Sequence, residues 1–201
     1  MKLELKTKAD FRVSEWSGGK SWELLLRPES GSYQEREFDL RISSASVDVE
    51  ESTFTPLPGF DRLICSLDGE LTLFHQKDEE DVISKVELKP YQFHSFSGGW
   101  HTRSIGKVQD FNVMCRAGFP AYVKLMTAGT RIPTQSLKTS PCRQGRQEAA
   151  FFTYEGSRLA YGPAKEVELP AFSLLLATEL SEDTYWEVLS KSSVIVVSWL
   201  C

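Results

Sequence analysis

Two arginines, Arg41 and Arg62, are the residues of this chain whose type and position best suit binding chemistry. Each lies in an alternating run typical of a β-strand, on the face opposite a row of apolar side chains. A guanidinium keeps its charge and presents a planar set of N–H donors that matches a carboxylate. The pair therefore predicts either an anion site or two structural ion pairs. In the structural alternative, Arg41 pairs with Asp39 or Asp110. Arg62 then pairs with Asp61.

In the binding alternative, at least one arginine faces the mouth of a β-barrel, which is a common place for a ligand site. Trp16 and Trp22, on either side of a Ser-Gly-Gly turn, are placed to wall such a pocket. The predicted ligand-binding residues are Arg62, Arg41, Trp16, Asp61 and Asn112. We expect the ligand to be a small anionic metabolite.

Short β-type runs separated by turn residues must position these side chains. Phe38, Leu40 and Ile42 form the apolar row opposite Arg41, and the run after Arg62 ends at Asp68-Gly69, which predicts a hairpin turn. Further strands are expected at 71–74, 82–88, 91–96, 110–114, 121–127, 149–154, 158–161, 165–169, 172–178 and 194–199. Residues 1–10 are expected to form an edge strand or arm, and 181–189 a short helix or a strand. Residues 129–148 show no clear pattern.

A weak internal repeat indicates two copies of one β unit. Val86-Glu87-Leu88 is echoed by Val167-Glu168-Leu169, and a proline and an aromatic residue follow each copy. An acidic-Gly turn, Asp68-Gly69 or Glu155-Gly156, precedes each. Many short strands with regular turns are typical of sandwiches and barrels. We therefore predict an all-β fold of two cupin-type jelly-roll β-barrels (a bicupin) with little helix. The expected barrels are residues 1–118 and 119–201, packed as one compact unit.

The overall charge narrows the choice of partners. The chain has 201 residues, a formal net charge of −5 and a pI of about 5.3. Nucleic acids and anionic membranes select basic surfaces, so neither is an expected partner. The first residues contain no apolar segment of a signal peptide, and the four cysteines form no C-x-x-C pair. We expect a cytoplasmic protein, with homo-oligomer formation left open.

Several segments together resemble the HutD/Ves family of bacterial proteins. The matching segments are Trp16-Ser17-Gly18-Gly19, Phe38–Ser43, Pro58–Arg62, Leu67-Asp68-Gly69 and Val108–Met114 with Arg116. The order PGFDR, LDG, DFNVM is the specific part, whereas the second half matches only in general pattern. The resemblance implies a two-cupin fold without the usual metal site, in proteins associated with histidine utilisation or described as cupin-like stress proteins. No catalytic activity is established for the family, so the resemblance carries none over to this chain. Many relatives have an Asn and three glycines after the first Trp, where this chain has only Ser17-Gly18-Gly19.

The histidines do not form the usual metal-binding pattern of a cupin enzyme. Such enzymes hold a divalent metal with a His-x-His pair, a glutamate and a further histidine. This chain has His75, His94 and His101, and none of them forms that pair. We therefore predict no metal and no cofactor. Nucleophilic catalysis has no better support, because Cys115 and Cys142 have no neighbouring base and no nucleophile-elbow motif occurs.

The leading hypothesis is a metal-free, HutD-like bicupin that binds a small carboxylate metabolite as a sensor or regulator, rather than a catalyst. One alternative is an enzyme, either a metal-free isomerase or lyase using Asp and Arg, or a weak metallo-cupin. The other is a structural or oligomerising protein with tryptophans at its interface.

Overall fold

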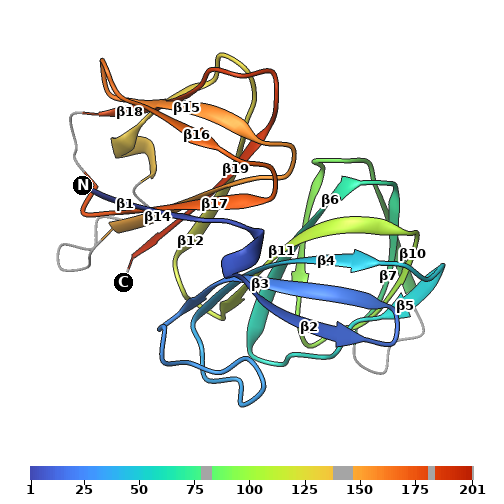
Figure 1. Cartoon of the computed structure of the whole chain (residues 1–201). Helices are drawn as coiled ribbons and strands as arrows, with labels where there is room; N and C mark the ends of the chain where they lie inside the picture. Colours follow the sequence, from blue (N-terminus) through green and yellow to red (C-terminus); the bar gives the residue numbers. More distant parts are fainter. Residues whose placement is uncertain (78–82, 138–146, 181–183, 201) are drawn as a thin grey trace. The chain divides into compact units, whose positions relative to one another are not determined.

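The computed structural model describes residues 1–77, 83–137, 147–180 and 184–200. The fold is all-β, as the sequence predicts, and in these residues the helix consists of two short 3-10 turns, η1 (Lys8–Asp10) and η2 (Thr134–Leu137). No helix there is long and apolar enough to cross a membrane. The chain divides into two compact units (Figure 1). The first barrel is Arg12–Phe119. The second barrel combines Met1–Phe11 with the chain from Pro120 onward.

The first barrel consists of two antiparallel sheets. Its strands are β2 (Arg12–Trp16), β3 (Gly19–Arg27), β4 (Leu40–Val47), β5 (Glu51–Thr53), β6 (Phe60–Asp68), β7 (Leu71–Gln76), β8 (Ile83–Leu88), β9 (Phe93–Ser97), β10 (His101–Ile105) and β11 (Val108–Arg116). One sheet has the order β2-β3-β4-β11-β6-β9 and the other β5-β10-β7-β8. Buried residues from both sheets, including Ile64, Leu73 and Phe96, form the core between them.

The second barrel has the same two-sheet plan. Its strands are β1 (Lys2–Lys6), β12 (Ala121–Met126), β13 (Arg131–Pro133), β14 (Gln147–Thr153), β15 (Ser157–Tyr161), β16 (Glu166–Leu169), β17 (Ser173–Thr178), β18 (Tyr185–Val188) and β19 (Val194–Leu200). The sheets are ordered β1-β17-β14-β19-β12 and β13-β18-β15-β16. Its interior is filled by apolar side chains such as Phe151, Trp186 and Val196.

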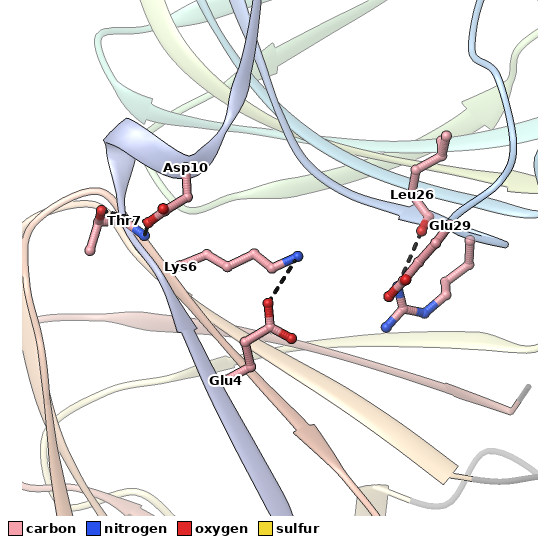
Figure 2. A network of polar contacts seen from close by, with 7 residues as sticks. Glu4, Lys6, Thr7, Asp10, Leu26 and Glu29 are labelled. Carbon is pink, nitrogen blue, oxygen red and sulfur yellow. Dashed lines mark hydrogen bonds and ion pairs between the residues drawn. The ribbon is translucent and has the colours of Figure 1, made fainter.

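The N-terminal strand belongs to the second barrel, which corrects the expected assignment of residues 1–11 to the first barrel. β1 pairs antiparallel with β17 and forms the edge of that sheet (Figure 1). The following η1 turn is closed by Asp10, whose carboxylate accepts hydrogen bonds from the Thr7 amide and hydroxyl, both at 2.8 Å (Figure 2). Strand pairing over such a sequence distance leaves no local signal in residues 1–11.

The two acidic-Gly turns are corners between sheets, so the predicted hairpin at Asp68-Gly69 is wrong. β6 pairs with β11 and β9, whereas β7 pairs with β10 and β8. Gly69 has φ +85°, and a Cβ there would lie 2.6 Å from the Lys107 carbonyl oxygen. The chain therefore needs glycine for this corner, as it would for a tight hairpin, and the sequence signal is the same in both cases.

The repeat seen in the sequence corresponds to matching structure in the two barrels. The first Val-Glu-Leu lies in β8, which pairs with β7, and the second lies in β16, which pairs with β15. Three residues after each leucine, Tyr91 and Phe172 both have positive φ, 64° and 53°. Both amides donate to a carbonyl just before the acidic-Gly corner, Ser66 and Tyr154.

The structure describes part of each of the two stretches whose structure the sequence left open, 129–148 and 181–189. Within 181–189, Tyr185–Val188 forms strand β18, and residues 181–183 lie outside the described part. Within 129–148, the chain forms β13 and η2, and residues 138–146 again lie outside it.

Candidate functional site

A pocket of about 270 Å³ lies inside the first barrel. Its wall is formed by β2, β3, β4, β6 and β11 and by residues 52–55. Strict alternation brings the lining side chains to one face of each strand, because successive residues of a strand point to opposite sides. On β11 the inward-facing residues are Asp110, Asn112 and Met114.

The central strand β11 places the two arginines on either side of one methionine. Met114 is opposite Arg41 on β4 and also opposite Arg62 on β6. Both arginines are buried, and each residue is 6% exposed. Two buried guanidiniums on one pocket wall require anionic or polar partners.

Arg41 has a full set of protein partners. Its Nε lies 3.0 Å from Glu23 Oε2, and its Nη1 donates to Ser43 Oγ at 2.9 Å. The guanidinium also lies over the Tyr33 ring, 4.1 Å from its centroid. Arg41 is thus in a structural ion pair, but with Glu23 and not with Asp39 or Asp110 as expected.

Arg62 has no such set of partners within the described part of the chain. Its Nε has no hydrogen bond although it is buried, and its Nη1 makes one long contact of 3.4 Å to the Thr55 carbonyl. The guanidinium lies 4.7 Å from the Phe54 ring centroid and 5.7 Å from that of Phe96. Burial lowers the pKa of Arg62 to about 10, partly opposed by Tyr33 and Asp110. The expected pair with Asp61 does not form, and no ion pair to Arg62 occurs among the described residues.

Two further polar side chains, Asp110 and Asn112, line the pocket. Asp110 Oδ1 accepts a hydrogen bond from the Ala45 amide at 2.8 Å, and no cation lies in direct contact with its carboxylate in the described chain. Burial raises the pKa of Asp110 to about 7, against the lowering effects of the Ala45 amide, Arg62 and Arg41. Asn112 Oδ1 is buried and accepts no hydrogen bond from any residue that the structure describes.

The structure places four of the five predicted site residues at the pocket. Arg62, Arg41, Trp16 and Asn112 line it. Trp16 is 38% exposed, and its indole lies so close to Gly18 that a Cβ there would be 2.2 Å from the ring. Asp61 is not part of the site, because alternation along β6 points it outward, where it is exposed. Trp22 faces away from the pocket for the same reason on β3.

Residues that the sequence did not assign to the site include Asp110, Phe54, Glu23, Tyr33, Ser43 and Met114. Ser43 and Met114 share the inward faces of β4 and β11 with the predicted residues, so the alternation could have revealed them. Glu23 and Tyr33 reach Arg41 only through strand pairing and a loop, and no local pattern indicates this.

Comparison with known families decides the relationship of this chain. The HutD family model matches residues 8–192. The chain belongs to the HutD family. HutD from Pseudomonas fluorescens SBW25 has a similar structure over 100% of both chains, with a TM-score of 0.73 and 17% identity. A conserved protein of unknown function from Pseudomonas aeruginosa PAO1 matches over 98% of this chain and 97% of its own, with a TM-score of 0.74 and 18% identity.

More distant structures share the cupin fold with this HutD-family chain. The nickel(II) complex of the bacterial pirin YhhW from Escherichia coli covers 99% of both chains, with a TM-score of 0.64 and 10% identity. Oxalate decarboxylase from Bacillus subtilis covers 97% of this chain and 76% of its own, with a TM-score of 0.60 and 8% identity. No match occurs among curated proteins. At such identities the likeness shows the fold alone.

Two of the three histidines of this HutD-family chain form a pair between the two sheets of the first barrel. His75 Nε2 on β7 lies 3.0 Å from His94 Nε2 on β9, and His75 Nδ1 lies 2.9 Å from Thr102 Oγ1. His101 is exposed at the start of β10. In the described ranges no three His, Cys, Asp or Glu side chains could hold a metal ion together. The absence of metal remains a prediction.

Two of the four thiols, those of Cys65 and Cys115, are held protonated. Burial raises the pKa of Cys65, and it raises that of Cys115 to about 12, so neither forms a thiolate near neutral pH. Cys142 lies outside the described residues.

We expect the histidine pair to make the protein less stable in mild acid. Burial, with a smaller effect of His94, lowers the pKa of His75 to about 4, whereas an unfolded histidine has an ordinary value of 6.5. The unfolded chain therefore binds more protons between these values. His75 contributes stability that is complete above about pH 6.5 and is lost as the pH falls towards about 4, by up to about 3 kcal/mol. Urea unfolding of the wild type and of His75→Gln measures the effect. Parallel pH curves for the two proteins would contradict it.

Proposed function

We propose that this HutD-family protein binds a small carboxylate metabolite in the pocket of its first barrel and acts as a sensor or regulator in the cytoplasm. The observation that supports this most directly is Arg62. A buried guanidinium with an unbonded Nε at a pocket wall is costly unless something supplies an acceptor. A carboxylate supplies two acceptor oxygens and a negative charge.

The size of the pocket limits the ligand. A volume of about 270 Å³ corresponds to roughly nine water molecules. The walls combine the apolar surfaces of Phe54, Trp16 and Met114 with the polar groups of Asn112 and Asp110. A small polar metabolite with one or two carboxylates suits this space better than a nucleotide or a lipid.

A thermal-shift screen tests the proposal. The probes are formate, acetate, succinate and glutarate; formate is included because the HutD structure from P. fluorescens is described for a formate condition. At about 100 times its Kd, a probe that binds only the folded protein adds about 2.7 kcal/mol. For a protein of this size, that raises the Tm by about 5–10 °C.

The matched variant is Arg62→Met, which keeps the apolar volume and removes the charge. We expect it to lose the response to every probe, while its own Tm equals or exceeds that of the wild type, because an unsatisfied buried donor is removed. Arg116→Met is the control, since Arg116 is half exposed and pairs with Asp39 instead of lining the pocket. An unresponsive wild type, or an equal response of Arg62→Met, would exclude a carboxylate site at Arg62.

One observation favours the enzyme alternative. A buried carboxyl group with a pKa of about 7 in a pocket that arginines also line, as at Asp110, suits general acid–base catalysis. NMR spectra of each stabilising probe after incubation with the protein distinguish the two functions. Unchanged probe supports binding alone, and conversion that Asp110→Asn abolishes supports a metal-free isomerase or lyase.

A further inference from the structure

Asp110 is held at the wall of the pocket in a position where its charge state matters to a bound anion. It is 6% exposed and lies on β11, between the strands that carry the two arginines. One carboxylate oxygen accepts from the Ala45 amide, and the residue's backbone carbonyl accepts from Ser44 Oγ at 2.5 Å. These bonds fix the side chain beside the cavity that it lines.

The charged protein groups around Asp110 balance one another when no anion is bound. The charged groups facing it are Arg62 on β6 and Arg41 on β4. Arg41 is already matched by Glu23 on β3, at 3.0 Å. Burial raises the pKa of the nearby Cys65 thiol, so it carries no charge near pH 7. Tyr33 is the other titratable group on this side of the pocket. Among the described residues, the Asp110 carboxylate is therefore the remaining counter-charge of Arg62.

A carboxylate bound to Arg62 takes over that role. The buried region then holds two negative charges, on the ligand and on Asp110, against the single unmatched positive charge of Arg62. Like charges that share a buried site raise the pKa of one of them. Protonation of Asp110 removes the excess charge and also gives it an O–H that can donate to the ligand.

We propose that anion binding in the first barrel is coupled to the uptake of one proton by Asp110, so that the site binds a carboxylate and a proton together. This inference rests on the proposed carboxylate site and adds its regulation by pH. Because Asp110 in the free protein has a pKa of about 7, it is already protonated in mild acid, and binding there needs no further proton. Above about pH 7, each bound anion takes up a proton, and the Kd should rise about tenfold per pH unit.

Methyl NMR of the full-length protein can follow weak binding directly. The chain has three methionines, and Met114 lies between the two arginines, with its Sδ 4.0 Å from Arg41 Nη1. Met126 is buried in the second barrel and serves as an internal control. The probes are acetate and methanesulfonate. Methanesulfonate is the anion of a strong acid and accepts no proton between about pH 6 and about pH 9, so it shows whether the proton goes to the protein.

Two variants accompany the wild type. Asp110→Asn keeps an oxygen for the Ala45 amide but carries no charge at any pH. Asp61→Asn removes an exposed carboxylate from β6, next to Arg62 in sequence but outside the pocket. We expect the Kd of both probes for wild type and Asp61→Asn to be constant in mild acid and to rise about tenfold per pH unit above about pH 7. For Asp110→Asn, the Kd should not change with pH.

The pH titration of the Met114 methyl signal gives the same answer without a variant. A saturating concentration of either probe should raise the midpoint pH of that titration in the wild type. Binding with a pH-independent Kd would overturn the proton coupling and leave the carboxylate site standing. A pH effect with acetate but not with methanesulfonate would place the proton on the ligand and also overturn it. If neither probe shifts Met114 at any pH, the carboxylate site and the coupling both fail.

Discussion

Arg41→Met should destabilise the protein by about 3–5 kcal/mol, which is a large part of the stability of a typical domain. Removing the guanidinium leaves Glu23 as a largely buried carboxylate without its main partner, with 16% of its side chain exposed. Its nearest remaining cation is Arg12, whose Nη1 lies 4.0 Å away on a largely exposed side chain. Breaking one partner of a buried ion pair costs more than the pair itself contributes, because the other charge stays desolvated. Urea unfolding measures the loss.

A double-mutant cycle with Glu23→Gln isolates the pair. We expect the double variant to be less destabilised than the sum of the two single variants, because neither charge is then left alone. Arg62→Met is the matched control, an arginine on the same pocket wall with the same exposure but no ion pair in the described chain. An additive cycle, or an equal cost for both arginine substitutions, would show that the Arg41–Glu23 pair does not stabilise the fold.

Phe151→Ala should lower the free energy of unfolding of the second barrel by about 3–5 kcal/mol. Phe151 is fully buried on β14, at the centre of its sheet, and its ring centroid lies 4.1 Å from that of Trp186. Deleting the ring removes buried apolar surface and leaves a cavity that its neighbours cannot fill completely. Chemical unfolding followed by circular dichroism measures the loss.

The control lies on the same sheet. Tyr122 on the edge strand β12 is 51% exposed, so Tyr122→Ala should change the stability by no more than about 0.5 kcal/mol. A small effect of Phe151→Ala would mean that the interior of the second barrel is loosely packed. That result would favour a second ligand site there over a solid structural core.

The two barrels therefore use one plan for different purposes. Both have the same corner after an acidic-Gly turn and the same positive φ three residues after the Val-Glu-Leu motif. In the first barrel, arginines, an aspartate and an asparagine occupy inward positions beside the pocket. In the second, the core cluster of inward positions is apolar, with Phe151 and Trp186 at its centre. A ligand site in the first barrel and a supporting role for the second are consistent with this difference.

The sequence alone determined most of the strands, their two faces and the repeat, but it did not predict β5, β10 or β13. Alternation is a local property, because neighbouring residues of a strand always point to opposite sides. It placed Arg41 and Arg62 on faces opposite their apolar neighbours, and these are the faces that line the pocket. The same rule applied to Asp61, next to Arg62, would have excluded it from the site.

Tertiary structure alone decided which groups meet across the barrel. Arg41 meets Glu23, 18 residues away, because β3 pairs with β4 through a bulge near Leu24, while Asp39 is held by Arg116 instead. Strand β1 joins the second barrel, Asp68-Gly69 turns between sheets, and His75 meets His94 from the opposite sheet. Each of these outcomes depends on the pairing of strands far apart in the chain. Turn residues and alternation are the same for every such pairing, so the partners of Arg41 and the lack of one for Arg62 emerge only when the barrel closes.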